Sequence, residues 1–270
     1  MSWFAAVLLG VVQGLTEFLP VSSSAHLILI RAFFGWEADE TLLQIFDVAC
    51  HVGTLVAVVT FFWADIWRMV RALPQILSPS AGPDAQRLRL VAIGTIPIVI
   101  VGGLFGHVLE ESVRTARVVA IPLALGGALL LVAERARRQV KTERAMSWRD
   151  ALVVGAAQAT ALVPGMSRSG ITITAGLFMG FDRAAIARFS FLLSVPAIIA
   201  AAAKGGLEMR HMALTAADFQ LFAIGMVTSA IVGYVAVSFL LRYLTTHRLD
   251  VFGWYRIALA LGTLAWLALR

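Results

Sequence analysis

Six long apolar stretches run through the chain, and each is close to the length that a helix needs to cross a bilayer. About 20 apolar residues span the hydrocarbon core, and the stretches cover residues 43–64, 90–109, 117–134, 184–203, 219–241 and 251–269. Long unbroken runs are typical of transmembrane helices, whereas a membrane β-barrel has short segments of alternating polarity. The pattern therefore predicts an all-α integral membrane protein with multiple spans.

Two further regions are apolar but interrupted by polar residues and proline. Residues 3–34 and 151–181 each contain two runs of about half a span, broken near Pro20 and Pro164. Such short runs are typical of re-entrant segments, which are tolerated at membrane depth where protein or a water-filled cavity surrounds them. Each broken region precedes three of the long stretches, so we expect a re-entrant helix pair followed by three transmembrane helices, twice.

The two broken regions resemble each other. Gln13 and Gln158 are each followed nine residues later by a serine, Ser22 and Ser167, so the offset is 145 in both cases. Three crossings is an odd number, so the second repeat would enter the membrane from the opposite face as an inverted-topology repeat. The expected organisation is a single membrane domain made of a first repeat, a basic cytoplasmic loop and a second repeat, at residues 1–134, 135–146 and 147–270.

The distribution of charge predicts the orientation. The chain is 60% hydrophobic and 14% charged, with a net charge of +6, and an excess of basic residues in such a protein marks cytoplasmic loops and not a nucleic-acid site. Under the re-entrant model, 13 of the 22 basic residues face one side: Arg68, Arg71, Arg87, Arg89, Arg135, Arg137, Arg138, Lys141, Arg144, Arg149, Arg183, Arg242 and Arg248. The opposite loops hold Arg114, Lys204 and Arg210. Both termini are therefore expected outside the cytoplasm.

The polar residues of the broken regions suggest a site for an anion. Gln13 and Glu17 are four residues apart and share a helix face. Serines are favoured N-caps, and a helix N-terminus is a ready anion site; the first region offers Ser22, Ser23, Ser24 and then His26, and the second offers Gly165, Ser167, Arg168, Ser169 and Gly170. The guanidinium of Arg168 suits phosphate, and Glu17 with His26 suits acid–base or metal-assisted chemistry.

Polar residues inside the long spans are assigned to structural roles. Asp47 and His51 lie four residues apart, which favours a local hydrogen-bonded pair near the outer surface over a supporting role at the site. Arg188, Arg256 and Asp182 are near span ends, where we expect them to reach the interface or to pair. The single cysteine, Cys50, excludes an internal disulfide and a Cys-based metal site.

The motifs GLTEFLPVSSSAH and PGMSRSGITIT, followed by FSFLLSVP, resemble the signatures of the bacterial undecaprenyl-diphosphate phosphatases, also called bacitracin-resistance proteins. The resemblance covers essentially the whole chain. It implies an inner-membrane hydrolase with an inverted repeat and a site open to the periplasm. Together with the charge distribution, this predicts that both termini are periplasmic. The resemblance also implies conversion of undecaprenyl diphosphate to undecaprenyl phosphate, which recycles the lipid carrier for cell-wall synthesis, and activity associated with Mg²⁺ or Ca²⁺.

The resemblance assigns roles to individual residues. The catalytic positions would be Glu17, Ser23, His26 and Arg168. The phosphate-binding positions would be Ser22, Ser24, Gly165, Ser167, Arg168, Ser169, Gly170 and Thr172. Many members have Glu at the position of Gln13, so a two-carboxylate metal site is not expected here, and Glu17 would hold a metal alone or together with substrate oxygens.

Several alternatives stay open from the sequence. Ser23 could attack the terminal phosphorus, or Glu17 or His26 could activate a water. Inverted repeats and broken helices are also typical of transporters, so a transporter or flippase for an anionic lipid is the competing function. A purely structural membrane subunit is disfavoured, because Glu17 and Arg168 would then lie in the membrane without purpose. The expected partners are the polyprenyl diphosphate and membrane lipids, and the sequence is compatible with a homo-oligomer.

Overall fold

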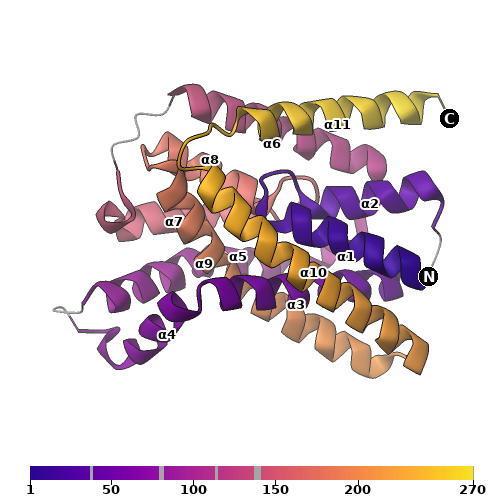
Figure 1. The fold of residues 1–270 in the computed structure, drawn as a ribbon, viewed down its shortest axis with the longest axis horizontal. Helices are drawn as coiled ribbons and strands as arrows, with labels where there is room; N and C mark the ends of the chain where they lie inside the picture. The colour runs from indigo at the N-terminus through magenta and orange to yellow at the C-terminus, as the bar shows by residue number, and fades with distance from the viewer. Residues whose placement is uncertain (37–38, 79–81, 113–114, 137–140, 270) are drawn as a thin grey trace.

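The computed structural model describes residues 1–36, 39–78, 82–112, 115–136 and 141–269. Within them the regular elements are helical, and the sole β-type pairing is an isolated bridge between Lys141 and Phe181. The α-helices are α1 Trp3–Phe18, α2 Ser23–Phe34, α3 Glu40–Phe61, α4 Trp63–Arg71, α5 Pro83–Ser112, α6 Ala116–Ala136, α7 Trp148–Thr160, α8 Arg168–Phe178, α9 Arg183–Glu208, α10 Ala216–Tyr243 and α11 Asp250–Ala268 (Figure 1). Short 3-10 turns cover Leu73–Gln75, Glu143–Ala145 and Met209–His211.

Six of the described helices are long and apolar enough to cross a membrane: α3, α5, α6, α9, α10 and α11. The shortest of them, α11, has 19 residues, close to the length that the hydrocarbon core requires. The prediction of an all-helical chain with six such helices is confirmed. Arg114, Arg137 and Arg138, which entered the charge argument, lie outside the described residues.

Helix α4 was not predicted from the sequence. The apolar run that reaches residue 64 is divided at Phe62, which is the C-cap of α3 and the N-cap of α4. The exposed rings of Trp63 and Trp67 stack 6.0 Å apart, and Arg68 bonds Asp65. Apolar and charged residues lie on different faces of this short helix, as in helices that lie along a membrane interface.

The short helices α1 and α7 are embedded between longer ones through glycines. A Cβ on Gly14 of α1 would lie 2.8 Å from Ser229 O of α10, and a Cβ on Gly155 of α7 would lie 2.1 Å from Gly94 O of α5. Glycine permits this close backbone approach, which is common between membrane helices. The ends of both short helices are therefore surrounded by protein.

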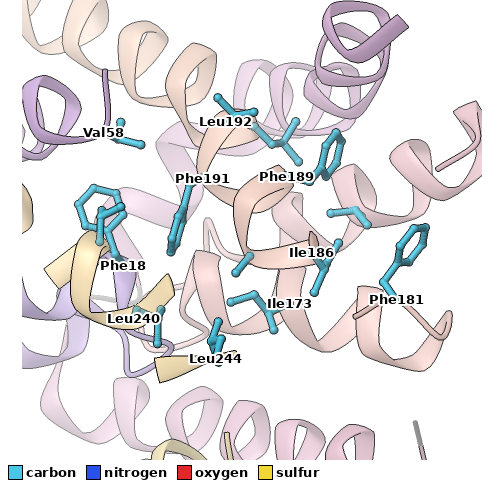
Figure 2. Close-up of a cluster of buried hydrophobic side chains, with 14 of the residues drawn as sticks. Phe18, Val58, Ile173, Phe181, Ile186, Phe189, Phe191, Leu192, Leu240 and Leu244 are labelled. Atoms are coloured by element: carbon cyan, nitrogen blue, oxygen red, sulfur yellow. The ribbon is translucent and has the colours of Figure 1, made fainter. Parts of the chain in front are cut away.

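A buried apolar cluster lies beneath the point where these short helices end (Figure 2). It includes Phe18 at the end of α1, Ile173 of α8 and Phe191 of α9. The rings of Phe18 and Phe191 meet edge to face at 5.4 Å. This cluster fixes α1, α8 and α9 relative to one another, and the polar loops after α1 and before α8 lie next to it.

The two chain termini lie at the same end of the long axis, and α4 lies at the other end (Figure 1). Helices α1 and α2 are on the side of the termini, whereas α7 and α8 are on the side of α4. The two helix pairs thus reach the middle of the molecule from opposite ends.

Candidate active site

The loop between α1 and α2 turns sharply at Ser22. This residue has a φ of 75°, a left-handed conformation that residues with a Cβ rarely adopt. Its Oγ accepts a hydrogen bond from Ala25 N at 3.4 Å, so Ser22 is the N-cap of α2. Ser23 and Ser24 therefore begin the helix and present their hydroxyls at its N-terminus.

The loop between α7 and α8 repeats this turn. Ser167 has a φ of 66°, and its Oγ accepts from Gly170 N at 3.1 Å as the N-cap of α8. Ser22 and Ser167 are the two non-glycine residues with positive φ in the described chain. They are also the serines that the sequence pairs at an offset of 145. Strained backbone of this kind is often found at functional sites.

The two loops contact each other directly, although they are far apart in the sequence. Gly165 N donates to Ser24 Oγ at 3.3 Å, and Ser169 Oγ donates to Leu19 O at 3.1 Å. The N-termini of α2 and α8 therefore lie at one place. Both carry the N–H groups of a first helical turn and the positive end of a helix dipole, so the junction favours an anion.

Glu17 is at the centre of this junction, with its side chain 3% exposed. Arg168 Nη2 bonds one carboxylate oxygen, Oε1. The other oxygen, Oε2, accepts from Ser23 Oγ at 2.7 Å and from Gln13 Nε2 at 2.9 Å. Three of the four predicted catalytic residues are thus joined in one network, and a serine hydroxyl already donates to a carboxylate within it.

The network faces a cavity of about 190 Å³. Its polar wall is formed by Glu17, Ser22, Ser23, Ser24, His51, Ser167 and Arg168, and its apolar wall by Ile98, Ala161, Leu162, Ala197, Ile198 and Ala201. A second hollow of about 260 Å³, which we call the vestibule, shares residues with the cavity and is also lined by Gln44, Asp47, Lys204 and Glu208. The cavity therefore adjoins the vestibule, which lies at the end of the molecule where α3 begins and α9 ends.

The remaining predicted phosphate-binding residues support the second loop. Gly170 N donates to Ser167 Oγ. Thr172 Oγ1 donates to Arg168 O at 2.7 Å and lies 2.5 Å from Ser190 Oγ. Gly165 has a φ of 97°, and its Cβ would lie 2.5 Å from Val119 O, so the turn requires glycine. In the described structure Gly165, Ser169, Gly170 and Thr172 are not among the residues that line the cavity.

His26 faces away from the cavity. Its Nδ1 lies 2.7 Å from Ser22 O and its Nε2 lies 2.7 Å from Tyr255 Oη of α11. The two rings stack at 5.6 Å. His26 and Tyr255 line an apolar groove between α2 and α11 instead. The structure therefore places His26 beneath the Ser22 turn, separate from Glu17 and Arg168.

The expected local pair of Asp47 and His51 is joined through the backbone oxygen of Asp47. The Asp47 carboxylate binds Arg31 of α2, with one contact at 3.0 Å, and His51 Nδ1 contacts the backbone oxygen of Asp47 at 2.7 Å. The other ring nitrogen of His51 lies 3.5 Å from Glu17 Oε2. A histidine within an apolar span is itself a signal of function, and the structure places His51 in the wall of the cavity.

Arg256 was expected to reach the interface or to pair, and the first of these alternatives is wrong. Its side chain is fully buried, and its guanidinium donates to Gly165 O at 3.1 Å, Met166 O at 2.7 Å and Leu123 O at 3.2 Å. Buried charges need such partners. Arg256 therefore ties the second loop to α6 and α11. Arg188, in contrast, pairs with Asp65 at 3.0 Å as expected.

The residues of the site do not fit a resident divalent cation. Mg²⁺ and Ca²⁺ need several oxygen ligands, but no group of three or more His, Cys, Asp or Glu side chains among the described residues is arranged to hold a metal ion. Both oxygens of Glu17 accept from Arg168, Ser23 and Gln13. A guanidinium and two helix N-termini form a site for an anion.

Comparison of the sequence with known proteins identifies a family. A model of the family "Bacitracin resistance protein BacA" matches residues 6–262. The chain is 45% identical over 258 residues to the undecaprenyl-diphosphatase of Rubrobacter xylanophilus, which covers 94% of each chain. It is 43% identical to that of Thermodesulfovibrio yellowstonii, over 95% of this chain and 94% of the relative. The identity to that of Desulforudis audaxviator is 40% over the full length of both.

Proposed function

The chain belongs to the bacitracin resistance protein BacA family, and we propose on this basis that it is an undecaprenyl-diphosphate phosphatase. The reaction is hydrolysis of undecaprenyl diphosphate to undecaprenyl phosphate and inorganic phosphate, which returns the lipid carrier to cell-wall synthesis and confers bacitracin resistance. The observation that carries the proposal is the network at Glu17. Its carboxylate binds the Ser23 hydroxyl and the Arg168 guanidinium, and all three residues line the same cavity.

The diphosphate is proposed to bind between the N-termini of α2 and α8. Arg168 offers a planar pair of donors for two phosphate oxygens, and Ser22, Ser24 and Ser167 line the same cavity. Donors fixed in this way would stabilise the charge that develops during phosphoryl transfer. Gly165, Ser169, Gly170 and Thr172 are proposed to act by holding the loop.

Ser23 is the preferred nucleophile, because its hydroxyl already donates to Glu17 at 2.7 Å. Its Oγ would form a bond to the terminal phosphorus as the bond to the bridging oxygen breaks, and the electron pair would leave with undecaprenyl phosphate. The proton of Ser23 would pass to Glu17 Oε2, which acts as general base. Water would then cleave the phosphoserine and release inorganic phosphate. Direct attack by a water that Glu17 activates is the alternative.

The size of the cavity supports a site for the headgroup alone. A pocket for a drug-sized ligand has about 300–1,000 Å³, so a cavity of about 190 Å³ suits a diphosphate better than a long lipid. An apolar groove of about 440 Å³ lies between α4, α5 and α9 and is lined by residues such as Met69, Val91 and Leu192. We propose that the polyprenyl chain leaves the cavity along α5 and α9.

The proposed setting is the bacterial inner membrane, with α1–α2 and α7–α8 as re-entrant pairs of an inverted repeat. The matching turns at Ser22 and Ser167 support the repeat. The vestibule is lined by Lys204 and Glu208, which the charge distribution assigns to the outside. The site would then open to the periplasm, and both termini, which lie at one end of the molecule, would be periplasmic.

The described residues do not form a cation site of their own, so a Mg²⁺ or Ca²⁺ that acts here would come with the substrate. Its contribution would be to offset the negative charge of the phosphates. The steps described for Ser23 and Glu17 use residues of this chain alone.

The test is phosphate release from undecaprenyl diphosphate by the purified protein in detergent, with and without a chelator. We expect release by the wild type and a strong decrease in the Glu17→Gln variant, which keeps the size of the side chain. A flippase would release no phosphate under these conditions. The absence of phosphate release by a folded wild-type protein, with a divalent cation present, would refute the proposed function.

A further inference from the structure

The orientation of the His51 ring is defined by one of its nitrogens. Nδ1 lies 2.7 Å from the backbone oxygen of Asp47. A carbonyl oxygen can only accept a hydrogen bond, so Nδ1 must carry the hydrogen and donate it. Such a contact at one ring nitrogen defines what the other can do. In His51, Nε2 is therefore the nitrogen that is available to exchange a proton.

Nε2 of His51 points toward the carboxylate that holds Ser23. It lies 3.5 Å from Glu17 Oε2, the same oxygen that accepts from Ser23 Oγ at 2.7 Å. An ionised carboxylate has no donor, and a neutral ring with its hydrogen on Nδ1 has a lone pair on Nε2. A favourable contact between these two atoms therefore needs one proton, carried by either of them.

The backbone that carries His51 is held in place. Asp47, one turn earlier on α3, has a buried ion pair with Arg31 of α2. Thr54 Oγ1 donates to the backbone oxygen of His51 at 2.9 Å. The ring is thus presented to Glu17 from a rigid helix, which is the arrangement that precise proton transfer requires.

His51 also connects the cavity with the solvent side. It lines both the cavity and the vestibule, and its side chain is 28% exposed, compared with 3% for Glu17. Lys204 and Glu208 are the charged groups of α9 in the same vestibule. A proton on Glu17 is enclosed by protein, whereas a proton on His51 lies on a partly exposed side chain.

We infer that His51 is a further catalytic residue, which stores the proton that Ser23 gives to Glu17; this inference rests on the proposed function. In the first step, Ser23 Oγ bonds to the terminal phosphorus, the bridging P–O bond breaks, and the proton passes through Glu17 Oε2 to His51 Nε2. In the second step, water bonds to phosphorus and the electron pair of the Oγ–P bond returns to Oγ. The stored proton returns to Ser23, and both protons of the water leave with the inorganic phosphate.

The assignment separates the two histidines near the site. Both ring nitrogens of His26 contact protein atoms, Ser22 O and Tyr255 Oη, so His26 is a positioning residue for the Ser22 turn. His51 has one nitrogen on the backbone and the other on the catalytic carboxylate. The histidine of the serine motif supports the turn, and the histidine of α3 exchanges the proton.

The experiment compares His51→Ala and His51→Gln with the wild type in phosphate release from undecaprenyl diphosphate. His247→Gln, at an exposed histidine after α10, is the matched control. Each purified variant is first tested for a wild-type-like thermal unfolding transition in detergent. We expect His51→Ala to be at least roughly a hundredfold slower, as for loss of an acid–base group, and added imidazole to restore at least about tenfold. His51→Gln should be slow without rescue, because its side chain fills the space, and His247→Gln should match the wild type.

The outcomes separate this inference from the function on which it rests. A His51→Gln variant within about threefold of the wild type would show that hydrogen bonding and packing are sufficient, and would overturn the inference. A folded His51→Ala variant that imidazole does not accelerate would overturn it as well. If His51→Ala does not fold, the rate of His51→Gln decides. A wild-type protein that releases no phosphate contradicts the proposed function itself, whatever the variants do.

Discussion

Replacing Arg168 by lysine separates the charge of this residue from its geometry. Arg168 is the first residue of α8. Its guanidinium bonds Glu17 through Nη2, and Nη1 lies 3.5 Å from Ser194 O. Lysine keeps the positive charge but offers a compact ammonium in place of a planar fork. Arg168→Lys therefore tests whether two phosphate oxygens are bound together in the transition state.

The expected loss follows from the contacts. One hydrogen bond to a charged group contributes about 1.5–3 kcal/mol, and about 1.4 kcal/mol corresponds to a tenfold change in rate. Loss of one arm of the fork should therefore slow Arg168→Lys by roughly 10- to 150-fold. Arg168→Ala also leaves the buried Glu17 carboxylate without its cation, which costs about 3–5 kcal/mol. The alanine variant should be nearly inactive and less stable, so the lysine variant is the more informative.

The assay is phosphate release by the purified variants at saturating and at low substrate, with thermal unfolding in detergent as a measure of folding. We expect the lysine variant to be folded and slow at both concentrations, since the lost interaction belongs to the transition state. A lysine variant within about threefold of the wild type has lost less than ~0.7 kcal/mol. That result would refute the bidentate role and leave charge balance as the function of Arg168.

Three further predictions concern the base, the topology and the helix packing. Glu17→Gln should fold and lose at least roughly a hundredfold in rate, because it removes the proposed proton acceptor; near-normal phosphate release would exclude that role. A cysteine in place of Arg144 should be labelled only from the cytoplasm and one in place of Ala213 only from the periplasm, both being exposed; the reverse pattern of labelling would contradict the proposed orientation. Gly155→Ala should lower the unfolding temperature, since overpacking costs about 1–3 kcal/mol and the Cβ would lie 2.1 Å from a backbone oxygen of α5. Gly206→Ala, where a Cβ has open space, is its control, and equal unfolding temperatures would argue against close packing of α5 and α7.

The sequence was sufficient for features that depend on local pattern. The long apolar runs identify the six long helices, because a membrane helix must satisfy its own backbone and be apolar over its length. The polar breaks identify the two loops, and within them Glu17, Ser23 and Arg168 are brought together in the structure. Helix α4 was missed because its apolar residues cover only one face, so that its average hydropathy is too low for a span.

Features that depend on contacts between distant helices could not be read from the sequence. His26 is adjacent to the serine motif, but the direction of its ring is determined by Tyr255, 229 residues later. His51 pairs in spacing with Asp47, yet the Asp47 side chain is taken by Arg31. Arg256 lies near the end of a span, and its burial follows from the carbonyl groups that two other segments present to it. In each case the partner determines the role.

In the empty site the Glu17 carboxylate occupies Arg168, so it competes with any anion that binds there. An anion that binds Nη2 of Arg168 competes with a carboxylate that belongs to the protein and cannot diffuse away. Inorganic phosphate lacks the lipid anchor of the substrate, so the return of Glu17 to Arg168 after turnover would favour its release. The diphosphate lipid is anchored in the membrane by its chain and can overcome this competition. The pair therefore favours entry of the substrate over retention of the product, which is suited to an enzyme that must release phosphate in every cycle.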